Sequence, residues 1–242
     1  MGAGPGDPGL LTIRGKEVLK EADVVLADRL VGEAILASIP GDKVIRVGKR
    51  PGGGRHTAES QEDINRMMVE MATQGKVVVR LKGGDSFIFG RGGEEVQALA
   101  AARIDFEVVP GVTSAIAAPA TFGIPVTHRD MSSLVTIVTG HEGVKKGSFP
   151  VDFRALASVG GTIVVLMGVS TMEGYIGELL EGGMDPSTAV AVIEKGTLRD
   201  QRMILGSLAD IVERVRDAKV GPPAVVVIGR VVELAKKVVN DS

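Results

Sequence analysis

The chain alternates short runs of β-branched residues with stretches in which apolar residues recur at helical spacing. Apolar residues three or four apart share one face of a helix, whereas short Val- and Ile-rich runs are typical of buried strands. The expected strands cover 23–27, 76–81, 106–109, 134–139, 162–166, 189–193, 202–205 and 224–228. The expected helices cover 12–22, 60–74, 94–102, 113–120, 171–181 and 207–217. This alternation predicts an α/β fold with helices on both faces of each sheet.

Two boundaries carry local signals. Ser60, followed three residues later by Asp63, has the pattern of a capped helix start, and Gly75 is expected to end that helix. Pro110 and Gly111 interrupt the chain near its middle. We therefore expect two small α/β domains, residues 1–112 and 113–242. The closely spaced strands within 189–205 indicate some antiparallel pairing in the second domain.

Composition excludes several classes of protein. The 242 residues include 28 Lys and Arg against 30 Asp and Glu, a net charge of −2, which argues against nucleic-acid binding. There is no Cys, so disulfides, thiolate metal sites and cysteine nucleophiles are excluded, and three scattered His argue against a metal site. No apolar run is long enough to span a bilayer, and the N-terminus lacks the pattern of a secretory signal. We expect a cytoplasmic protein without a metal.

Two glycine-rich segments are candidate ligand loops. In the segment 2–9, the third glycine of a dinucleotide-binding fingerprint is replaced by Asp7, and two prolines remove backbone donors, which disfavours a nicotinamide site. A simple turn is the alternative reading of that segment. The segment 80–95 has five glycines within eleven residues and follows a predicted strand, where open α/β sheets bind ligands. Phe87, Ile88 and Phe89 would give it an apolar wall.

Basic residues recur at the ends of predicted strands and in turns. Arg29 follows Asp28, Lys49 and Arg50 follow Gly48, and His128 and Arg129 follow Thr127. Each alone is typical of a solvated loop. Together, in a nearly neutral chain, they favour a small polyanionic ligand over a nucleic-acid duplex.

Read in order, these segments resemble the tetrapyrrole methylases over essentially the whole chain. The matching segments are 2–12, 28–31, 48–50, 80–95, 109–115, 123–130, 139–141 and 194–197. The combination of 80–95 with Thr127-His128-Arg129-Asp130 points to the members that methylate uroporphyrinogen III rather than to more distant ones. The resemblance implies a homodimer of two-domain chains with an active-site cleft between the domains. It also implies transfer of two methyl groups from S-adenosylmethionine, giving precorrin-2 through precorrin-1, for sirohaem or cobalamin synthesis.

The resemblance also assigns roles to residues. Asp28 matches the family's proton acceptor and Lys49 its proton donor. The residues that match the lining of the methyl-donor site are Pro5, Gly83, Gly84, Asp85, Ile88, Thr113, Ser114, Met167, Gly196 and Ala224. The substrate has eight carboxylates, and the residues expected to contact them are Arg29, Arg50, Arg91, His128 and Arg129.

The chemistry agrees with the composition. A sulfonium methyl group is already electrophilic and needs no metal, while a placed carboxylate can take a proton from the ring system. Two alternatives stay open: a methylase acting on a later precorrin of cobalamin synthesis, and a tetrapyrrole-binding protein without catalytic activity. The sequence departs from the family at its start, because the family has an apolar strand before the first glycine and this chain starts at Met1. Either the sequence begins late, or the first sheet lacks an inner strand.

Overall fold

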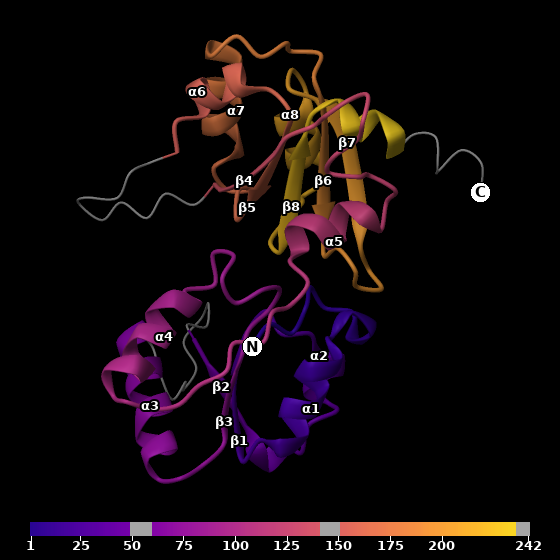
Figure 1. The fold of residues 1–242 in the computed structure, drawn as a ribbon. Coiled ribbons are helices and arrows are strands. Elements are labelled where there is room, and N and C mark those ends of the chain that lie inside the picture. Colours follow the sequence, from indigo (N-terminus) through magenta and orange to yellow (C-terminus); the bar gives the residue numbers. More distant parts are fainter. Residues whose placement is uncertain (49–59, 141–150, 236–242) are drawn as a thin grey trace. The chain divides into compact units, whose positions relative to one another are not determined.

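The computed structural model describes residues 1–48, 60–140 and 151–235. The chain forms two compact units, Met1–Ser114 (unit 1) and Ala115–Ser242 (unit 2), each with its own sheet (Figure 1). Over the described ranges, no helix has the length and apolar character needed to cross a membrane.

Unit 1 is built on a small parallel sheet. Its strands are β1 (Val24–Asp28), β2 (Val44–Val47) and β3 (Val78–Leu81), in the order β2-β1-β3. Figure 1 shows α1 and α2 on one side of this sheet and α3 and α4 on the other. The helical segments are η1 (Pro8–Leu10), α1 (Ile13–Glu21), α2 (Glu33–Leu36), η2 (Gly41–Lys43), α3 (Gln61–Thr73) and α4 (Gly92–Ala101).

The alternation of side chains along β1 produces two apolar layers in unit 1. Val25 and Ala27 pack with α1 and α2, whereas Leu26, between them in the sequence, packs with Ile64 and Met68 of α3. Successive strand residues face opposite sides of a sheet, so both faces of β1 are covered. The predicted cap of α3 is confirmed, since the Ser60 side chain accepts a hydrogen bond from the Asp63 N–H and the Asp63 carboxylate accepts one from the Ser60 N–H.

Unit 2 has a five-stranded sheet in the order β4-β5-β8-β6-β7. Only β4 and β5 pair in parallel; the other three pairings are antiparallel, which confirms the antiparallel component expected in this half. The strands are β4 (Val135–Thr139), β5 (Thr162–Leu166), β6 (Ala189–Glu194), β7 (Arg202–Ser207) and β8 (Ala224–Ile228). The helical segments are α5 (Ser114–Ala120), α6 (Phe153–Val159), α7 (Met172–Glu181), α8 (Ile211–Asp217) and η3 (Arg230–Leu234).

Both faces of the unit 2 sheet are apolar. Ile163 and Val165 of β5 pack with α7 and α8, whereas Val164 and Leu166 pack with α5 and η3. β6 and β8 divide their side chains between the same two layers. Unit 2 therefore has a hydrophobic layer on each side of its sheet.

The structure corrects several expected elements. Residues 106–109 do not form the expected strand, because they do not pair with β3. The first residues of the chain lie between the two segments: the Lys82 N–H donates to the Met1 carbonyl, and the Gly2 N–H donates to the Val109 carbonyl. The helix expected from residue 207 begins at Ile211, since Ser207 and Asp210 close a turn before it. The elements α2, β2 and α6 were not expected.

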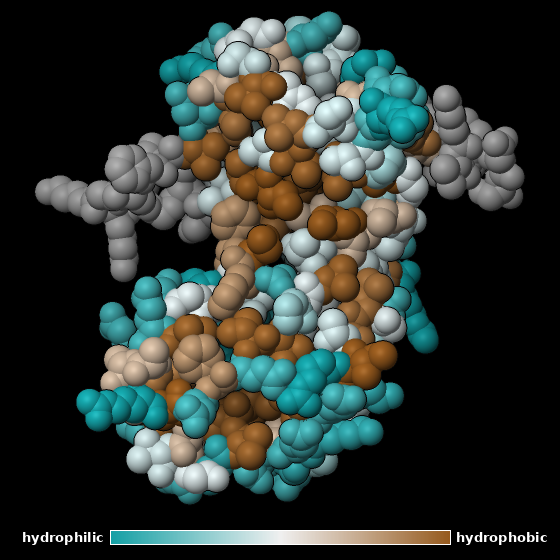
Figure 2. All heavy atoms as spheres, viewed as in Figure 1, coloured by the Kyte–Doolittle hydropathy of each residue, from teal (hydrophilic) through white to brown (hydrophobic). Residues whose placement is uncertain are grey.

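A cavity in unit 1 lies beside the segment 106–109, which does not form the expected strand. β3 is an edge strand, and a cavity of about 460 Å³ lies along it, lined by Met1, by 77–80 and by 104–109. We call it the β3 slot. Figure 2 shows hydrophobic residues in a recess of unit 1 with hydrophilic residues beside them.

Candidate active site

Two glycine-rich segments of unit 1 and the segment that contains Gly111 meet beside the end of β3. The Gly4 N–H donates to the Gly84 carbonyl at 3.1 Å, and the Gly84 N–H donates to the Gly4 carbonyl at 2.7 Å. A Cβ atom on Gly2 would lie 2.6 Å from the Gly111 Cα, so these backbones approach as closely as only glycine allows. The structure thus brings the first glycine-rich segment, the 80–95 loop and the Pro110 region together.

The side chain of Asp85 joins two of these segments. Its carboxylate accepts hydrogen bonds from the Phe87 N–H at 2.8 Å and from the Gly111 N–H at 2.9 Å. Gly84 has a φ of 66°, and a Cβ there would make ordinary contact with Thr113 and Ser114. The surface beside 113–114 is therefore bare backbone.

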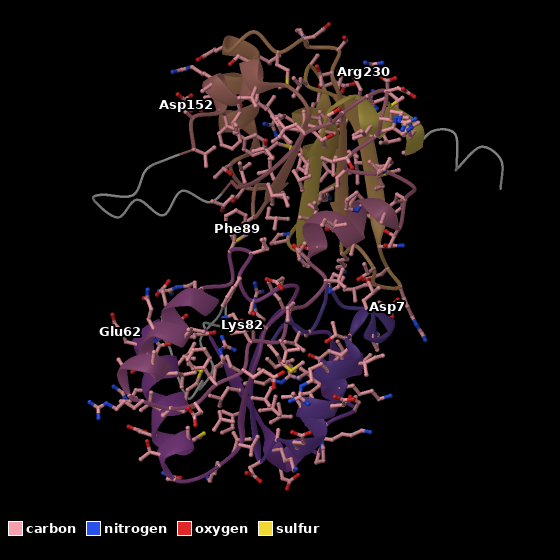
Figure 3. The ribbon with its side chains drawn as sticks, in the orientation of Figure 1. Asp7, Glu62, Lys82, Phe89, Asp152 and Arg230 are labelled. Atoms are coloured by element: carbon pink, nitrogen blue, oxygen red, sulfur yellow. The ribbon has the colours of Figure 1, made fainter. Side chains whose placement is uncertain are left out.

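The predicted methyl-donor residues of unit 1 are gathered in this region. Pro5 lies on the first glycine-rich segment, Gly83 to Ile88 on the loop after β3, and Thr113 and Ser114 beside Gly84. Phe87 is 55% exposed, and Ile88 and Phe89 are also exposed, as an apolar wall for a ligand requires. Figure 3 places Phe89 on this loop and Lys82 within the body of unit 1. Bare backbone with an apolar wall fits an adenosyl methyl donor, which presents polar edges and a flat base.

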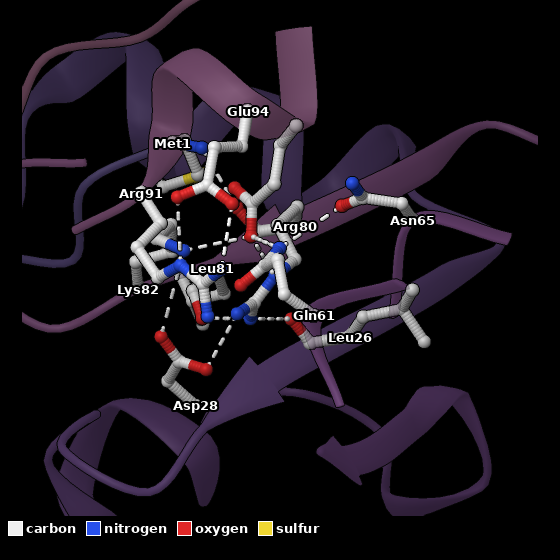
Figure 4. Close-up of polar contacts among 11 residues, drawn as sticks. Met1, Leu26, Asp28, Gln61, Asn65, Arg80, Leu81, Lys82, Arg91 and Glu94 are labelled. Carbon is white, nitrogen blue, oxygen red and sulfur yellow. Dashed lines mark hydrogen bonds and ion pairs between the residues drawn. The ribbon is translucent and has the colours of Figure 1, made fainter. Parts of the chain in front are cut away.

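A cluster of charged side chains lies next to this loop (Figure 4). Asp28, the last residue of β1, pairs with Arg80 of β3 through Nη2 and Oδ1 at 2.6 Å. Glu95 of α4 pairs with Arg80 at 2.8 Å and with Lys82 at 2.7 Å. Sequence reasoning assigned no role to Arg80 or Glu95. The available signal was the two cations that flank Leu81 in an otherwise Val-rich strand.

The α-amino group of Met1 lies close to this cluster. It donates to the Arg80 carbonyl at 2.7 Å. Burial lowers the pKa of this amino group from 8.0 to about 6; Glu95 opposes the shift, and Arg80 and Lys82 add to it. A partly buried ammonium group beside two cations is an unfavourable arrangement.

The predicted methyl-donor residues of unit 2 lie at one end of its sheet. Met167 follows β5, Gly196 follows β6, and Ala224 begins β8. Glu194 pairs with Ala224, and Leu166 pairs with Val225, so β8 starts between the ends of β5 and β6. Met167, Lys195 and Thr197 all have a positive φ, which bulky residues adopt only when the surroundings impose it. Met167 is also 50% exposed.

The predicted carboxylate-binding residues are spread over both units. Arg29 is exposed after β1, and Arg91 forms a two-bond pair with Glu94 at 2.8 and 2.6 Å. His128 and Arg129 lie on a turn closed by the His128 N–H and the Ser132 carbonyl at 2.9 Å. Ser132 accepts from Thr162 at the start of β5, so this turn is bonded to the opposite end of the strand from Met167.

Some predicted residues lie outside the described part of the chain. Lys49, the predicted proton donor, and Arg50, a predicted carboxylate contact, both fall there. Within the described ranges, no group of His, Asp and Glu residues is arranged to hold a metal ion.

Comparisons with known proteins give a consistent result. A family model described as Tetrapyrrole (Corrin/Porphyrin) Methylases matches residues 1–212. An S-adenosyl-L-methionine-dependent uroporphyrinogen III methyltransferase from Methanosarcina barkeri is 51% identical over 97% of this chain and 91% of its own length.

Solved structures agree with the sequence matches. The uroporphyrin-III C-methyl transferase of Thermus thermophilus, solved with S-adenyl homocysteine, is 40% identical, with a TM-score of 0.80 over 97% of each chain. A cobalt precorrin-4 methyltransferase of cobalamin biosynthesis is 29% identical, with a TM-score of 0.83 over 96% of this chain and 94% of its own. These likenesses extend over both units.

Proposed function

The chain belongs to the tetrapyrrole methylases, and we propose that it methylates uroporphyrinogen III with S-adenosylmethionine as the methyl donor. Two methyl groups would be added to ring carbons, giving precorrin-2 through precorrin-1. The observation that carries the proposal is the 51% identity to a named uroporphyrinogen III methyltransferase over almost the whole chain. The glycine-lined region of unit 1 supports it, because its chemistry fits the donor.

The bound donor supplies a methyl group on a positively charged sulfur. The residues of the chain have to hold both reactants and accept a proton from the ring. In the proposed arrangement, the backbone around Gly84 and Thr113 with the wall at Phe87 and Ile88 binds the donor. Holding two reactants in line can lower a barrier by about 7–11 kcal/mol. For unit 2, the family resemblance assigns Met167, Gly196 and Ala224 to the binding of the donor.

Proton movement in this proposal rests on Asp28 and Lys49. Methylation forms a carbon–carbon bond with an electron pair of the ring, the carbon–sulfur bond breaks with its pair kept by sulfur, and a ring proton is released. Asp28 accepts that proton as a carboxylate, and Lys49 donates where the product needs one. Arg29, Arg50, Arg91, His128 and Arg129 bind the substrate's carboxylates, each as a charge-assisted pair.

The test is a methylation assay followed by mass measurement of the product. The chain is incubated with uroporphyrinogen III and isotope-labelled S-adenosylmethionine. We expect a product that has gained two methyl groups and an intermediate that has gained one. No methyl transfer to uroporphyrinogen III would reject the proposal.

A methylase for a later precorrin is the second candidate, favoured by the structural likeness to the cobalt precorrin-4 methyltransferase. Methyl transfer to a later precorrin but not to uroporphyrinogen III would select it. A tetrapyrrole-binding protein without catalysis would bind the macrocycle and transfer no methyl group from the labelled donor.

The assembly and location expected from the sequence are further parts of the proposal. A homodimer would have twice the mass of one chain by light scattering, at concentrations where the enzyme is active. A cytoplasmic protein would be recovered in the cytoplasmic fraction of its host after cell fractionation. A monomer that is fully active would remove the dimer from the proposal.

A further inference from the structure

We infer that Arg80 and Lys82, held in place by Glu95, are positioning residues that fix the Asp28 carboxylate for its part in methyl transfer. The inference rests on the proposed function, because these residues act through Asp28. Asp28 is the last residue of β1, Arg80 lies within β3, Lys82 directly follows β3 and Glu95 lies on α4. Figure 4 labels Asp28, Arg80 and Lys82.

Arg80 contacts both strands and the helix with its whole guanidinium group. Its Nη2 donates to Asp28 Oδ1 at 2.6 Å, its Nη1 to the Leu26 carbonyl at 3.1 Å, and its Nε to Glu95 Oε1 at 2.8 Å. The planar guanidinium allows these bonds in one orientation only. The position of Asp28 Oδ1 is therefore tied to the backbone of β1.

Lys82 faces the second oxygen of the same carboxylate. Its Nζ lies 3.8 Å from Asp28 Oδ2 and donates to Glu95 Oε1 at 2.7 Å. Each oxygen of Asp28 thus has its own cation. This arrangement restrains rotation of the carboxylate about its last bond.

Glu95 connects the cations to the helix layer. Its Oε1 accepts hydrogen bonds from Arg80, from Lys82 and, at 3.2 Å, from Gln61 of α3. Gln61 in turn donates to Asn65 at 2.9 Å. Glu95 therefore fixes both cations and balances part of their charge.

The exposure of the four side chains differs in one respect. The side chains of Arg80, Lys82 and Glu95 are 9%, 4% and 6% exposed, whereas that of Asp28 is 28% exposed. Asp28 is the member of the cluster with the greatest access to a ligand. The other three are placed to act on Asp28 rather than on a reactant.

Stability alone does not account for the cluster. Buried ion networks are often no more stabilising than apolar side chains of the same volume, because removing charges from water is costly. A functional base, by contrast, has to be correctly oriented before reaction, and a cation beside each carboxylate oxygen of Asp28 provides that orientation.

The experiment measures Arg80→Lys in two backgrounds, the otherwise unchanged chain and Asp28→Asn. Arg80→Lys keeps the charge but loses the planar fork. We expect kcat to fall roughly 10- to 100-fold and KM for S-adenosylmethionine to change less than about threefold. In the Asp28→Asn background we expect Arg80→Lys to change kcat less than about twofold, because its target is gone. Arg66→Met, at an exposed pair on α3, is the control.

The outcomes separate this inference from the proposed function. An equal fall of kcat in both backgrounds, or loss of S-adenosylhomocysteine binding by calorimetry in Arg80→Lys, would overturn the positioning role. Full activity of Asp28→Asn would also overturn it while leaving uroporphyrinogen III methylation intact. If Arg80→Lys does not fold, Lys82→Met is compared in the same two backgrounds, with an expected fall of roughly 3- to 10-fold in kcat. An unmodified chain that transfers no methyl group would instead reject the proposed function.

Discussion

Units 1 and 2 both place helices on a β-sheet, but the two sheets bring different groups to their ends. In unit 1 the three strands are parallel, so Asp28 at the end of β1 and Lys82 directly after β3 meet at the same edge. In unit 2 three of the four strand pairings are antiparallel, so the start of β8 lies between the ends of β5 and β6. Charged side chains therefore lie at the strand ends of unit 1, and backbone turns lie at those of unit 2.

The interiors of the two units differ in the same way. Unit 2 has apolar layers on both faces of its sheet. Unit 1 has a smaller sheet, an open β3 slot and a buried charge cluster. Both units have two apolar layers, but in unit 1 the buried charges of Arg80, Lys82 and Glu95 lie among them.

Removing one charge from the cluster should have the largest effect on stability. Glu95→Gln leaves Arg80 and Lys82 without their shared carboxylate, and loss of one partner from a buried pair costs about 3–5 kcal/mol. Urea unfolding measures the change. The matched control is Glu94→Gln, the neighbouring residue, whose pair with Arg91 is exposed and should contribute at most about 1 kcal/mol.

A combined substitution sharpens this prediction. Replacing Arg80 and Lys82 by Met and Glu95 by Leu should recover most of the stability that Glu95→Gln loses, because apolar side chains can replace a buried ion network. Methyl transfer should remain low. Recovery of both stability and activity would show that the charges have no role in catalysis.

The sequence was sufficient for the elements whose signals are local. The periodicity and cap of α3, and the runs that form β5 and β8, were predicted within a few residues. The family resemblance is confirmed by the family match. Residues 106–109 were wrongly predicted to be a strand because their side chains favour extended backbone. A strand also needs a neighbouring strand to pair with, and most of this segment borders the β3 slot instead.

The charge cluster could not be predicted for a related reason. Arg80 and Glu95 are 15 residues apart and pair only because α4 folds back over β3. Periodicity marks Arg80 as a residue within a buried strand but does not identify its partner. The gathering of Gly2, Gly84 and Gly111 is likewise a tertiary feature, although the resemblance had already assigned Gly84 to the donor site.

The amino group of Met1 should make unit 1 sensitive to pH. Its folded pKa of about 6 is below the ordinary 8.0, so between pH 6 and 8 the unfolded chain binds a proton that the folded chain does not. Stability should therefore rise with pH across this window, by at most about 2–3 kcal/mol. The charged groups around this amino group are Glu95, Arg80, Lys82 and Asp85. Urea unfolding at a series of pH values gives the slope.

An engineered extension tests the same feature. Adding four Val and Ile residues before Met1 converts the ammonium into an amide and offers a strand to the β3 slot. The melting temperature should increase, and the rise in stability from pH 6 to 8 should become smaller. An extension that alternates Pro and Gly is the control, because it removes the charge but cannot pair as a strand. Equal melting temperatures for the two extensions would show that the slot does not accept a strand.

The smallest expected effect is in unit 2, at Tyr175 of α7. Its ring stacks on Phe153 with centroids 5.1 Å apart, and its hydroxyl is the one buried side-chain polar atom without a hydrogen-bond partner in the described ranges. Burial also raises the pKa of this hydroxyl. Because a buried hydroxyl without a partner is unfavourable, Tyr175→Phe should stabilise the chain by about 1 kcal/mol and leave methyl transfer unchanged.

The matched substitution Phe153→Leu keeps the Tyr175 hydroxyl and loses the ring stack, so it should destabilise the chain by about 1 kcal/mol. Thermal unfolding of the two variants measures both changes against the unmodified chain. A lower melting temperature for Tyr175→Phe would mean that the hydroxyl is hydrogen-bonded in solution. The interior of unit 2 would then contain a second buried polar contact besides that of Thr162 with Ser132, and the contrast with unit 1 would be one of degree.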